Sequence, residues 1–391
     1  MKLAIKLAFK NLIGAGLRTW LNVIVLSFSF VLIIAARGIL VGWDRQAKKD
    51  MTDWEIGGGQ YWNVHYDPYD AFTLNDAHAP IPEQFIPEIE SKDMVPVLIT
   101  QGTIYPEGRM QSILIKGINP DQTLLELPAH KLDTVVGAVP AIIGSNMARN
   151  NKLKIGDYIT IRWRDANGTF NATEIYITCI FSANVPTIDV SQVWIPLDSL
   201  QSMLLMPGEA TIFTYRDRDK IRVELSVWKV VTHKDLVKDI EAMIKTKSVG
   251  QSIFYTILLL LALLAIFNTQ VLSIFRRQRE IGTYIALGYT RPQVVGLFTI
   301  EGAMHAIFAA IVGAIYGVPL LMLLARKGIT LGMSASDYGF AIADTMYPVY
   351  STGLVIGTTI AVLLATAVVS YWPSRRIAKM NPTEALRGKL Q

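Results

Sequence analysis

The stretch IFYTILLLLALLAIFNTQVLSIF, residues 253–275, contains no charged residue and is followed at once by the basic sequence RRQR, residues 276–279. A run of about 20 apolar residues is long enough to cross the hydrocarbon core of a bilayer as a helix. Three further runs of this kind occupy residues 20–42, 294–325 and 350–372. The sequence therefore predicts four transmembrane helices, of which residues 253–275 form the second.

The composition favours a membrane protein over a soluble enzyme. The chain has 391 residues, of which 51% are hydrophobic and only 18% are charged, against about 25% charged in soluble domains. The formal net charge is +5, and its distribution argues against a nucleic-acid-binding patch. The single cysteine, Cys179, excludes an intrachain disulfide and is interpreted as a small buried residue.

The basic residues predict the orientation. Three segments hold 13 Lys or Arg and only 2 acidic residues: the start of the chain up to residue 19, residues 276–293 and residues 373–391. Since Lys and Arg accumulate on the cytoplasmic side, we expect these segments to be cytoplasmic. Residues 43–252, with 21 basic and 27 acidic residues, and the loop 326–349 are then extracytoplasmic.

The N-terminal segment, residues 1–19, has lysines at positions 2, 6 and 10 and apolar residues between them. This spacing predicts an amphipathic helix at the cytoplasmic surface of the membrane. The apolar run that follows is long and is not followed by a cleavage pattern, so a retained anchor is expected instead of a signal peptide.

The block 43–252 reads as a mixed α/β domain. β-rich stretches at residues 95–103, 111–117, 158–163, 174–181 and 222–231 predict strands, and residues 82–91 and 234–246 predict helices. The turn sequence Asp165-Ala166-Asn167-Gly168 predicts a hairpin between two strands. Gly57-Gly58-Gly59 is interpreted as a flexible turn.

Motifs that carry chemistry do not occur in the sequence. There is no phosphate-binding P-loop and no nucleophile elbow, and the five histidines are scattered without metal-ligand spacing. We therefore predict no catalytic residue, no metal and no cofactor in this chain. Any energy input is expected from a partner or from a gradient.

Two charged residues fall inside the predicted spans. Arg37 is expected to reach the outer membrane surface with its side chain. Glu301 is expected to be buried against another helix or to pair with a basic residue near the inner surface, and a proton-relay role is less favoured.

Two motifs resemble the FtsX/MacB/LolC-type ABC transporter permeases. The first, FRRQREIGTYIALGYTRPQVVGLFTIEG at residues 275–302, combines basic residues, E-I-G, A-L-G and a Glu-Gly pair in the next span. The second is the C-terminal sequence YWPSRRIAKMNPTEALRG, residues 371–388. Its matching positions are Pro373, Ala378, Pro382, Ala385, Leu386 and Arg387.

The resemblance implies a membrane subunit that works with a separate ABC ATPase, in a complex of two permease and two ATPase chains. ATP and Mg²⁺ would be bound by the ATPase. Residues 278–289 would form a coupling helix that contacts it. The implied coupling residues are Arg276, Arg277, Arg279, Glu280, Gly282, Ala286, Leu287 and Gly288.

The cargo is left open by the resemblance. The LolC/LolE branch of the family is the most similar to three segments of the large domain, at residues 114–122, 142–161 and 193–206. This similarity implies release of lipoproteins from the outer leaflet of a bacterial inner membrane into the periplasm. A periplasmic chaperone or adaptor would be a further partner. The short hairpin at residues 165–173 departs from the chaperone-binding hook of LolC. MacB-like export of drugs, peptides or toxins, and FtsX-like regulation of cell-wall enzymes, are the alternatives. Acyl chains would meet a cleft lined by Phe28, Leu32, Ile33, Ile257, Leu261 and Leu264.

Overall fold

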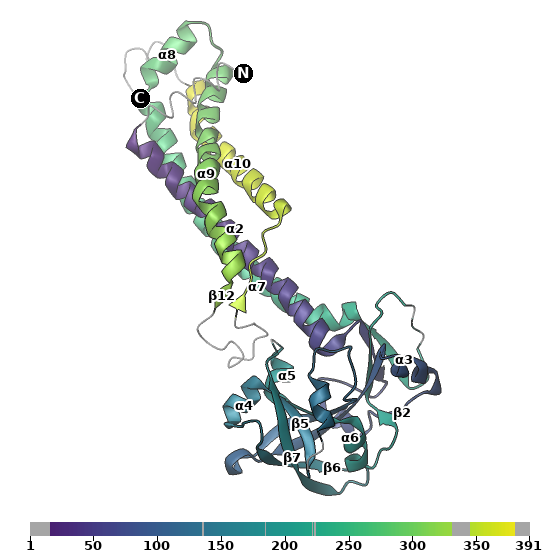
Figure 1. Ribbon diagram of the computed structural model, residues 1–391. Helices are drawn as coiled ribbons and strands as arrows, with labels where there is room; N and C mark the ends of the chain where they lie inside the picture. The colour runs from purple at the N-terminus through teal and green to yellow at the C-terminus, as the bar shows by residue number, and fades with distance from the viewer. Residues whose placement is uncertain are drawn as a thin grey trace. The chain divides into compact units, whose positions relative to one another are not determined.

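A computed structural model describes residues 16–134, 137–183, 185–220, 222, 224–330 and 345–379. The chain divides into two compact units (Figure 1). We call residues 1–43, 244–329 and 347–391 the helical unit, and residues 44–243 and 330–346 the α/β unit. The predicted amphipathic helix falls largely on residues 1–15, which lie outside the described residues, as do Pro382, Ala385, Leu386 and Arg387.

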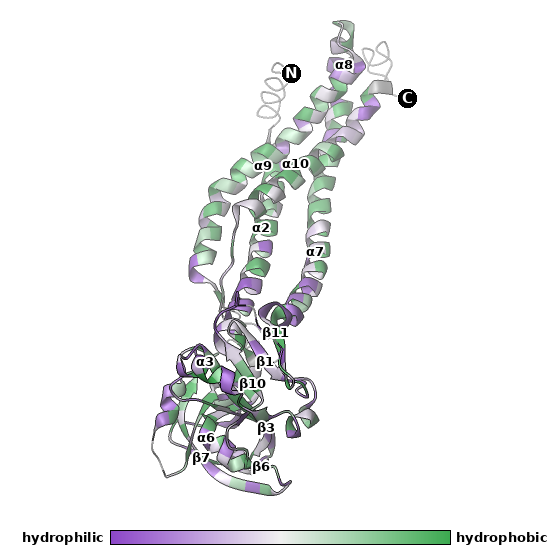
Figure 2. Ribbon diagram, turned by 90° about the vertical axis from the view of Figure 1, so that its right-hand side faces the viewer, coloured by the Kyte–Doolittle hydropathy of each residue, from purple (hydrophilic) through white to green (hydrophobic). Residues whose placement is uncertain are grey.

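Four helices of the described chain are long and apolar enough to cross a membrane. They are α2 (Leu17–Met51), α7 (His233–Arg276), α9 (Arg291–Lys327) and α10 (Thr352–Ser374). Figure 2 shows their apolar residues in green along each of them. The shorter helices α8 (Gln278–Ala286) and η7 (Arg375–Lys379) follow α7 and α10 along the chain. The prediction of four apolar helices is confirmed, while the helices α2 and α7 extend past the apolar runs that predicted them.

The helical unit is held together by close helix packing. A Cβ atom at Gly317 of α9 would lie 2.6 Å from Val31 Cγ2 of α2, so only glycine permits this approach. Small residues let helices approach closely inside membranes, where no hydrophobic effect drives helices together. The Asn22 side chain of α2 also donates to Thr269 Oγ1 of α7 at 2.6 Å, which satisfies two polar groups inside an apolar bundle.

The α/β unit contains the strands β1 to β11. Their bounds are β1 Gly59–Asn63, β2 Ala79–Pro80, β3 Met94–Ile104, β4 Gln111–Ile118, β5 Val139–Gly144, β6 Tyr158–Arg164, β7 Phe170–Phe181, β8 Gln192–Pro196, β9 Glu209–Ala210, β10 Ile212–Tyr215 and β11 Trp228–Thr232. Two short strands, β12 Ile329–Thr330 and β13 Thr345–Met346, pair with each other.

The large sheet of the described residues has the order β11-β1-β10-β3-β4-β8-β5-β7-β6, with β3 and β6 also paired. That last pairing closes six strands into a ring, because β3 is long enough to pair with β10 near its start and with β6 near its end. The ring encloses a core of branched residues, including Ile115, Ile143 and Ile177. The alternating exposure of β6, with Ile159, Ile161 and Trp163 buried, is that of a strand with one face on a core.

Short helices connect these strands: η1 Thr52–Ile56, η2 Ala71–Asn75, η3 Glu83–Phe85, α3 Ile86–Glu90, η4 Pro106–Gly108, η5 Ala129–Asp133, α4 Ser145–Asn151, α5 Pro186–Ser191 and α6 Leu197–Leu204. The predicted hairpin is present, since Asp165 lies at the turn between the antiparallel strands β6 and β7. The strand predicted for residues 222–231 is wrong in extent, because regular pairing with β1 begins only at Trp228.

The prediction that Gly57-Gly58-Gly59 forms a flexible turn is wrong. All three glycines are buried, and a Cβ at Gly58 would lie 2.3 Å from the backbone oxygen of Arg216. Gly57 also has φ of +55°, a conformation that glycine adopts without strain. The triplet is therefore a tightly packed entry into the sheet.

Candidate functional site

Helix α8 has one packed face and one open face. Gln278, Ile281 and Gly282 are buried, and Ile281 packs in an apolar cluster with Phe298 of α9 and Ile377 of η7. The buried positions follow the i, i+3, i+4 spacing of an amphipathic helix. On the open face, Leu287 leaves 72% of its surface exposed at the end of the helix. A single exposed apolar side chain is common on protein surfaces, and Leu287 marks the side of α8 that the described chain leaves uncovered.

Both ends of the α8–α9 connection are fixed by backbone geometry. Gly288 has φ of +95°, and the amides of Gly288 and Tyr289 donate to the oxygens of Ile285 and Tyr284. This pattern is a Schellman motif, which requires a left-handed residue just after the helix. Thr290 and Gln293 then form a capping box at the start of α9. Because both ends are capped, the helix ends at Ala286 and not at residue 289 as predicted.

An ion-pair network joins the start of α8 to α9. Arg277 Nη1 lies 2.9 Å from both carboxylate oxygens of Glu301, and its Nε lies 2.7 Å from Glu280 Oε2. The guanidinium also lies over the ring of Phe298, 4.9 Å from its centre. The side chain of Arg277 is 18% exposed and that of Glu301 is 8% exposed. A pair this buried depends on its geometry, because removing one partner leaves a desolvated charge.

The residue after Glu301 brings two further helices close. A Cβ atom at Gly302 would lie 2.2 Å from Ser370 Oγ of α10 and 3.0 Å from Gln270 Nε2 of α7. The Glu301-Gly302 pair of the sequence motif therefore serves two contacts. The acid binds Arg277, and the glycine permits α10 and α7 to approach α9.

The structure divides the predicted coupling residues between the two faces. Arg277 and Gly282 lie on the packed side of α8. The exposed residues are Arg276, Arg279, Glu280, Ala286, Leu287 and Gly288. Glu280 lies in the first turn of α8, where the helix dipole favours a carboxylate.

The residues predicted for a cargo cleft also divide. Phe28, Ile257, Leu261 and Leu264 expose more than half of their surface, whereas Ile33 is 7% exposed. Leu32 is half-buried, and Arg37 of α2 is exposed. Pro373, from the C-terminal motif, is buried at the end of α10. Ile33 thus packs inside the bundle of a single chain and does not line an open surface.

Sequence reasoning did not identify three contributors to the site: Phe298, Gln270 and Ser370. Phe298 precedes Glu301 by three residues, a spacing that places both on one face of a helix. That spacing could have identified it. Gln270 and Ser370 belong to other helices, and no pattern in the sequence links them to Gly302.

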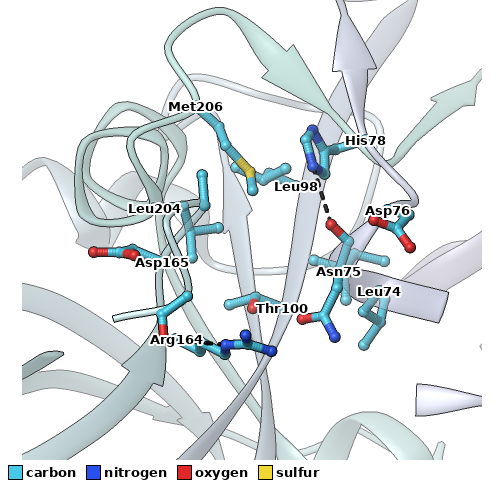
Figure 3. Close-up of a pocket in the computed structure, with 13 residues that line it drawn as sticks. Leu74, Asn75, Asp76, His78, Leu98, Thr100, Arg164, Asp165, Leu204 and Met206 are labelled. Atoms are coloured by element: carbon cyan, nitrogen blue, oxygen red, sulfur yellow. Dashed lines mark hydrogen bonds between the residues drawn. The ribbon is translucent and has the colours of Figure 1, made fainter. Parts of the chain in front are cut away.

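The α/β unit has a cavity of about 350 Å³ between η2, β3, the β6–β7 hairpin and the end of α6 (Figure 3). Two of the side chains that line it, Arg164 and His78, bond within the chain. Arg164 Nε donates to the oxygen of Gly168 at 3.2 Å, and His78 contacts Glu209 and the oxygen of Asn75. Within the part of the chain that the structure describes, no group of three His, Cys, Asp or Glu residues could hold a metal ion.

Comparison with known families identifies the region that contains this site. Residues 252–382 match the family described as FtsX-like permease C-terminal. Residues 252–382 form an FtsX-like permease domain. The ion-pair network, α8 and Gly302 all lie inside this FtsX-like domain. The predicted resemblance to FtsX/MacB-type ABC permeases is confirmed.

Curated proteins that are similar in sequence to this chain are also ABC transporter permeases. An uncharacterized ABC transporter permease of Methanocaldococcus jannaschii is 28% identical over 162 residues, covering 41% of this chain and 38% of that protein. The macrolide export ATP-binding/permease protein MacB of Agrobacterium fabrum is 25% identical over 234 residues, covering 56% of this chain and 34% of that protein. The chain thus spans little more than a third of the length of these relatives.

A solved structure is also similar in part. It is the extracellular domain of the noncanonic ABC-type transporter YknZ from Gram-positive bacteria, with 14% sequence identity and a TM-score of 0.28. The match covers 44% of this chain and 99% of the YknZ domain.

Proposed function

We propose that this chain is the membrane-spanning permease subunit of an ABC transporter, and that α8 transmits ATP hydrolysis from a separate ABC ATPase. The observation that supports this proposal best is the two-faced α8. Its packed face is joined to α9 by the Arg277–Glu301 pair, while its other face is open and carries Leu287. A partner that moves α8 would therefore move α9 with it.

The proposed complex contains two ATPase chains, which bind ATP and Mg²⁺, and two permease chains, either identical or paralogous. No nucleic acid takes part. The four helices α2, α7, α9 and α10 cross the inner membrane of a bacterial cell, with α8 in the cytoplasm and the α/β unit in the periplasm. The charge distribution of the sequence supports this orientation.

The helix α7 suggests how movement reaches the periplasmic side. It is one helix of 44 residues that begins directly after β11 and is separated from α8 by a single residue, Arg277. The helix α2 is followed by η1 and then by β1, the neighbour of β11 in the sheet. In this proposal no channel is needed, because α2 and α7 carry the movement mechanically between two states of the protein.

The proposed cargo is an amphiphile taken from the outer leaflet or the periplasm. The exposed apolar residues Phe28, Ile257, Leu261 and Leu264 would contact it. Each buried CH₂ group contributes about 0.8 kcal/mol. The MacB relatives are named for macrolide export, so we place macrolide-like export ahead of lipoprotein release. A periplasmic adaptor or chaperone is a further partner in either case.

The test expresses the chain together with the ABC ATPases of its own organism, one at a time, in cells that lack their own exporters. We expect ATP-dependent extrusion of erythromycin and co-purification of the ATPase. Leu287→Glu should abolish both, since it places a charge on the open face of α8. The matched control is Ile155→Glu, at a position of the α/β unit that is 61% exposed, and it should change neither.

The alternatives predict different results in the same cells. Co-purified lipoprotein, with erythromycin retained, would support lipoprotein release. The regulatory alternative would be supported if the ATPase co-purified, if neither erythromycin nor lipoprotein were transported, and if cell-wall hydrolysis changed. Failure of the ATPase to bind the wild-type chain would contradict the proposal as a whole.

A further inference from the structure

The segment η1, residues Thr52–Ile56, is a π-helical turn at the end of α2. The backbone amide of Gly57 donates a hydrogen bond to the carbonyl oxygen of Thr52 at 2.9 Å, which is the i to i+5 bond of a π-helix. Such turns are rare and occur frequently at functional sites. The side chains of η1 are therefore of interest.

Two consecutive residues of η1 contact the sheet of the α/β unit. Trp54 stacks on Phe181 at the end of β7, with ring centres 5.5 Å apart. Glu55 Oε1 lies 2.9 Å from Lys116 Nζ of β4. These two consecutive residues therefore contact two different strands of the sheet, β7 and β4.

The Glu55–Lys116 pair is enclosed by the sheet. Lys116 is 4% exposed and lies over the Trp194 ring, 5.0 Å from its centre. Gln192, two residues before Trp194 on β8, donates to the same Glu55 oxygen at 3.4 Å. Burial raises the pKa of Glu55, but Lys116 and Gln192 outweigh it and lower the pKa overall. The carboxylate is thus held in its charged form by two neighbouring strands of the closed ring.

Close to η1, side chains of α2 and of η1 itself also contact α7. Lys48 lies 2.8 Å from Glu241, and Thr52 Oγ1 lies 2.8 Å from His233 Nε2. The strands that follow α2 and precede α7, β1 and β11, are paired along their whole length. Both helices therefore join the sheet at neighbouring strands, and Glu55 of η1 also contacts the ring strands β4 and β8.

We propose that η1 is a rigid joint through which movement of α2 enters the α/β unit, and that Glu55 is its positioning residue. The proposal rests on the proposed function, because only a chain driven by an ATPase has movement to transmit. Glu55 acts through Lys116, and neither residue touches the cargo. Breaking the pair should therefore leave ATP hydrolysis intact and decouple α2 from the sheet.

The molecule offers a matched control. Glu88 of α3 pairs with Arg222 at 2.7 Å, and the side-chain exposures are 23% and 6%, against 20% and 5% for Glu55 and Lys116. This control pair is similarly buried in the same unit, but it does not involve α2 or α7. A loss caused merely by a broken buried ion pair would appear equally in both sets of variants.

The experiment measures the distance between spin labels at Arg45 of α2 and Asp198 of α6, two exposed positions of the α/β unit. The background is Cys179→Ser, and the full chain with its ATPase is placed in nanodiscs, with and without ATP. The joint variants are Glu55→Gln and Glu55→Gln combined with Lys116→Met. The double variant leaves no unpaired buried charge and so preserves the fold. The control is Glu88→Gln combined with Arg222→Met.

We expect a narrow distance distribution in the wild type and in the control, and a broadened one in both joint variants. The joint variants should hydrolyse ATP at the wild-type rate and lose erythromycin extrusion. A double joint variant with a distribution as narrow as the control would overturn the inference. If the wild type binds no ATPase, the proposed function fails, and the distance distribution of the chain alone still decides whether η1 is a rigid joint.

Discussion

The Arg277–Glu301 pair gives the sharpest energetic prediction. Arg277→Met removes a cation that makes two 2.9 Å contacts with a carboxylate that is 8% exposed. Removing one partner of a buried pair costs about 3–5 kcal/mol. Glu301→Gln should cost less, about 1–2 kcal/mol, because Arg277 keeps Glu280 and the ring of Phe298.

The double variant separates pairing from packing. If the two side chains stabilise each other, Arg277→Met with Glu301→Gln should be less destabilised than the sum of the single variants, by about 2 kcal/mol. That difference corresponds to a factor of about 30 in the unfolding equilibrium constant. The assay is reversible unfolding of the full chain in mixed micelles with increasing sodium dodecyl sulfate. Costs that add within about 0.5 kcal/mol would refute the pairing.

Other predictions follow from single contacts. Glu280→Lys, on the open face of α8, should insert normally but uncouple ATP hydrolysis from extrusion, and wild-type extrusion would contradict this. Gly302→Ala should cost about 1–3 kcal/mol through the clash with Ser370, and Ser370→Gly should restore part of the loss in the unfolding assay. Burial, with Arg218 and Lys48 nearby, lowers the pKa of His233 below its ordinary value of 6.5. Stability should therefore be full above about pH 6.5 and fall as the pH drops through the lowered pKa, and His233→Gln should flatten that unfolding profile. A photo-crosslinker at Leu261 should capture cargo while one at the buried Ile33 should not, and equal capture would argue against the proposed surface.

The sequence predicted those features that depend on local physical chemistry. Uninterrupted apolar runs leave few alternatives to membrane-spanning helices, and the four helices are present. A helix was predicted for residues 278–289, and α8 is present there, but it ends earlier because Gly288 adopts the left-handed conformation. The turn residues 165–168 predicted the β6–β7 hairpin for a similar reason.

Features that depend on tertiary packing were not predictable. The sequence does not distinguish which of Arg276, Arg277 and Arg279 forms an internal ion pair. Arg277 pairs with Glu301 because it lies at the break between α7 and α8. The Gly57-Gly58-Gly59 triplet reads as a flexible segment until β10 is known to pack against it. Lys116 occurs in an apolar strand, and its partner Glu55 lies 61 residues away.

The account depends most on α8 as the contact with an ABC ATPase. The direct measurement is chemical cross-linking from Leu287→Cys, in the Cys179→Ser background, to the purified ATPase in membranes. We predict a cross-linked product of permease and ATPase that ATP binding changes in amount, and none from the exposed control Ile155→Cys of the α/β unit. No product from Leu287→Cys, or equal products from both positions, would contradict the account.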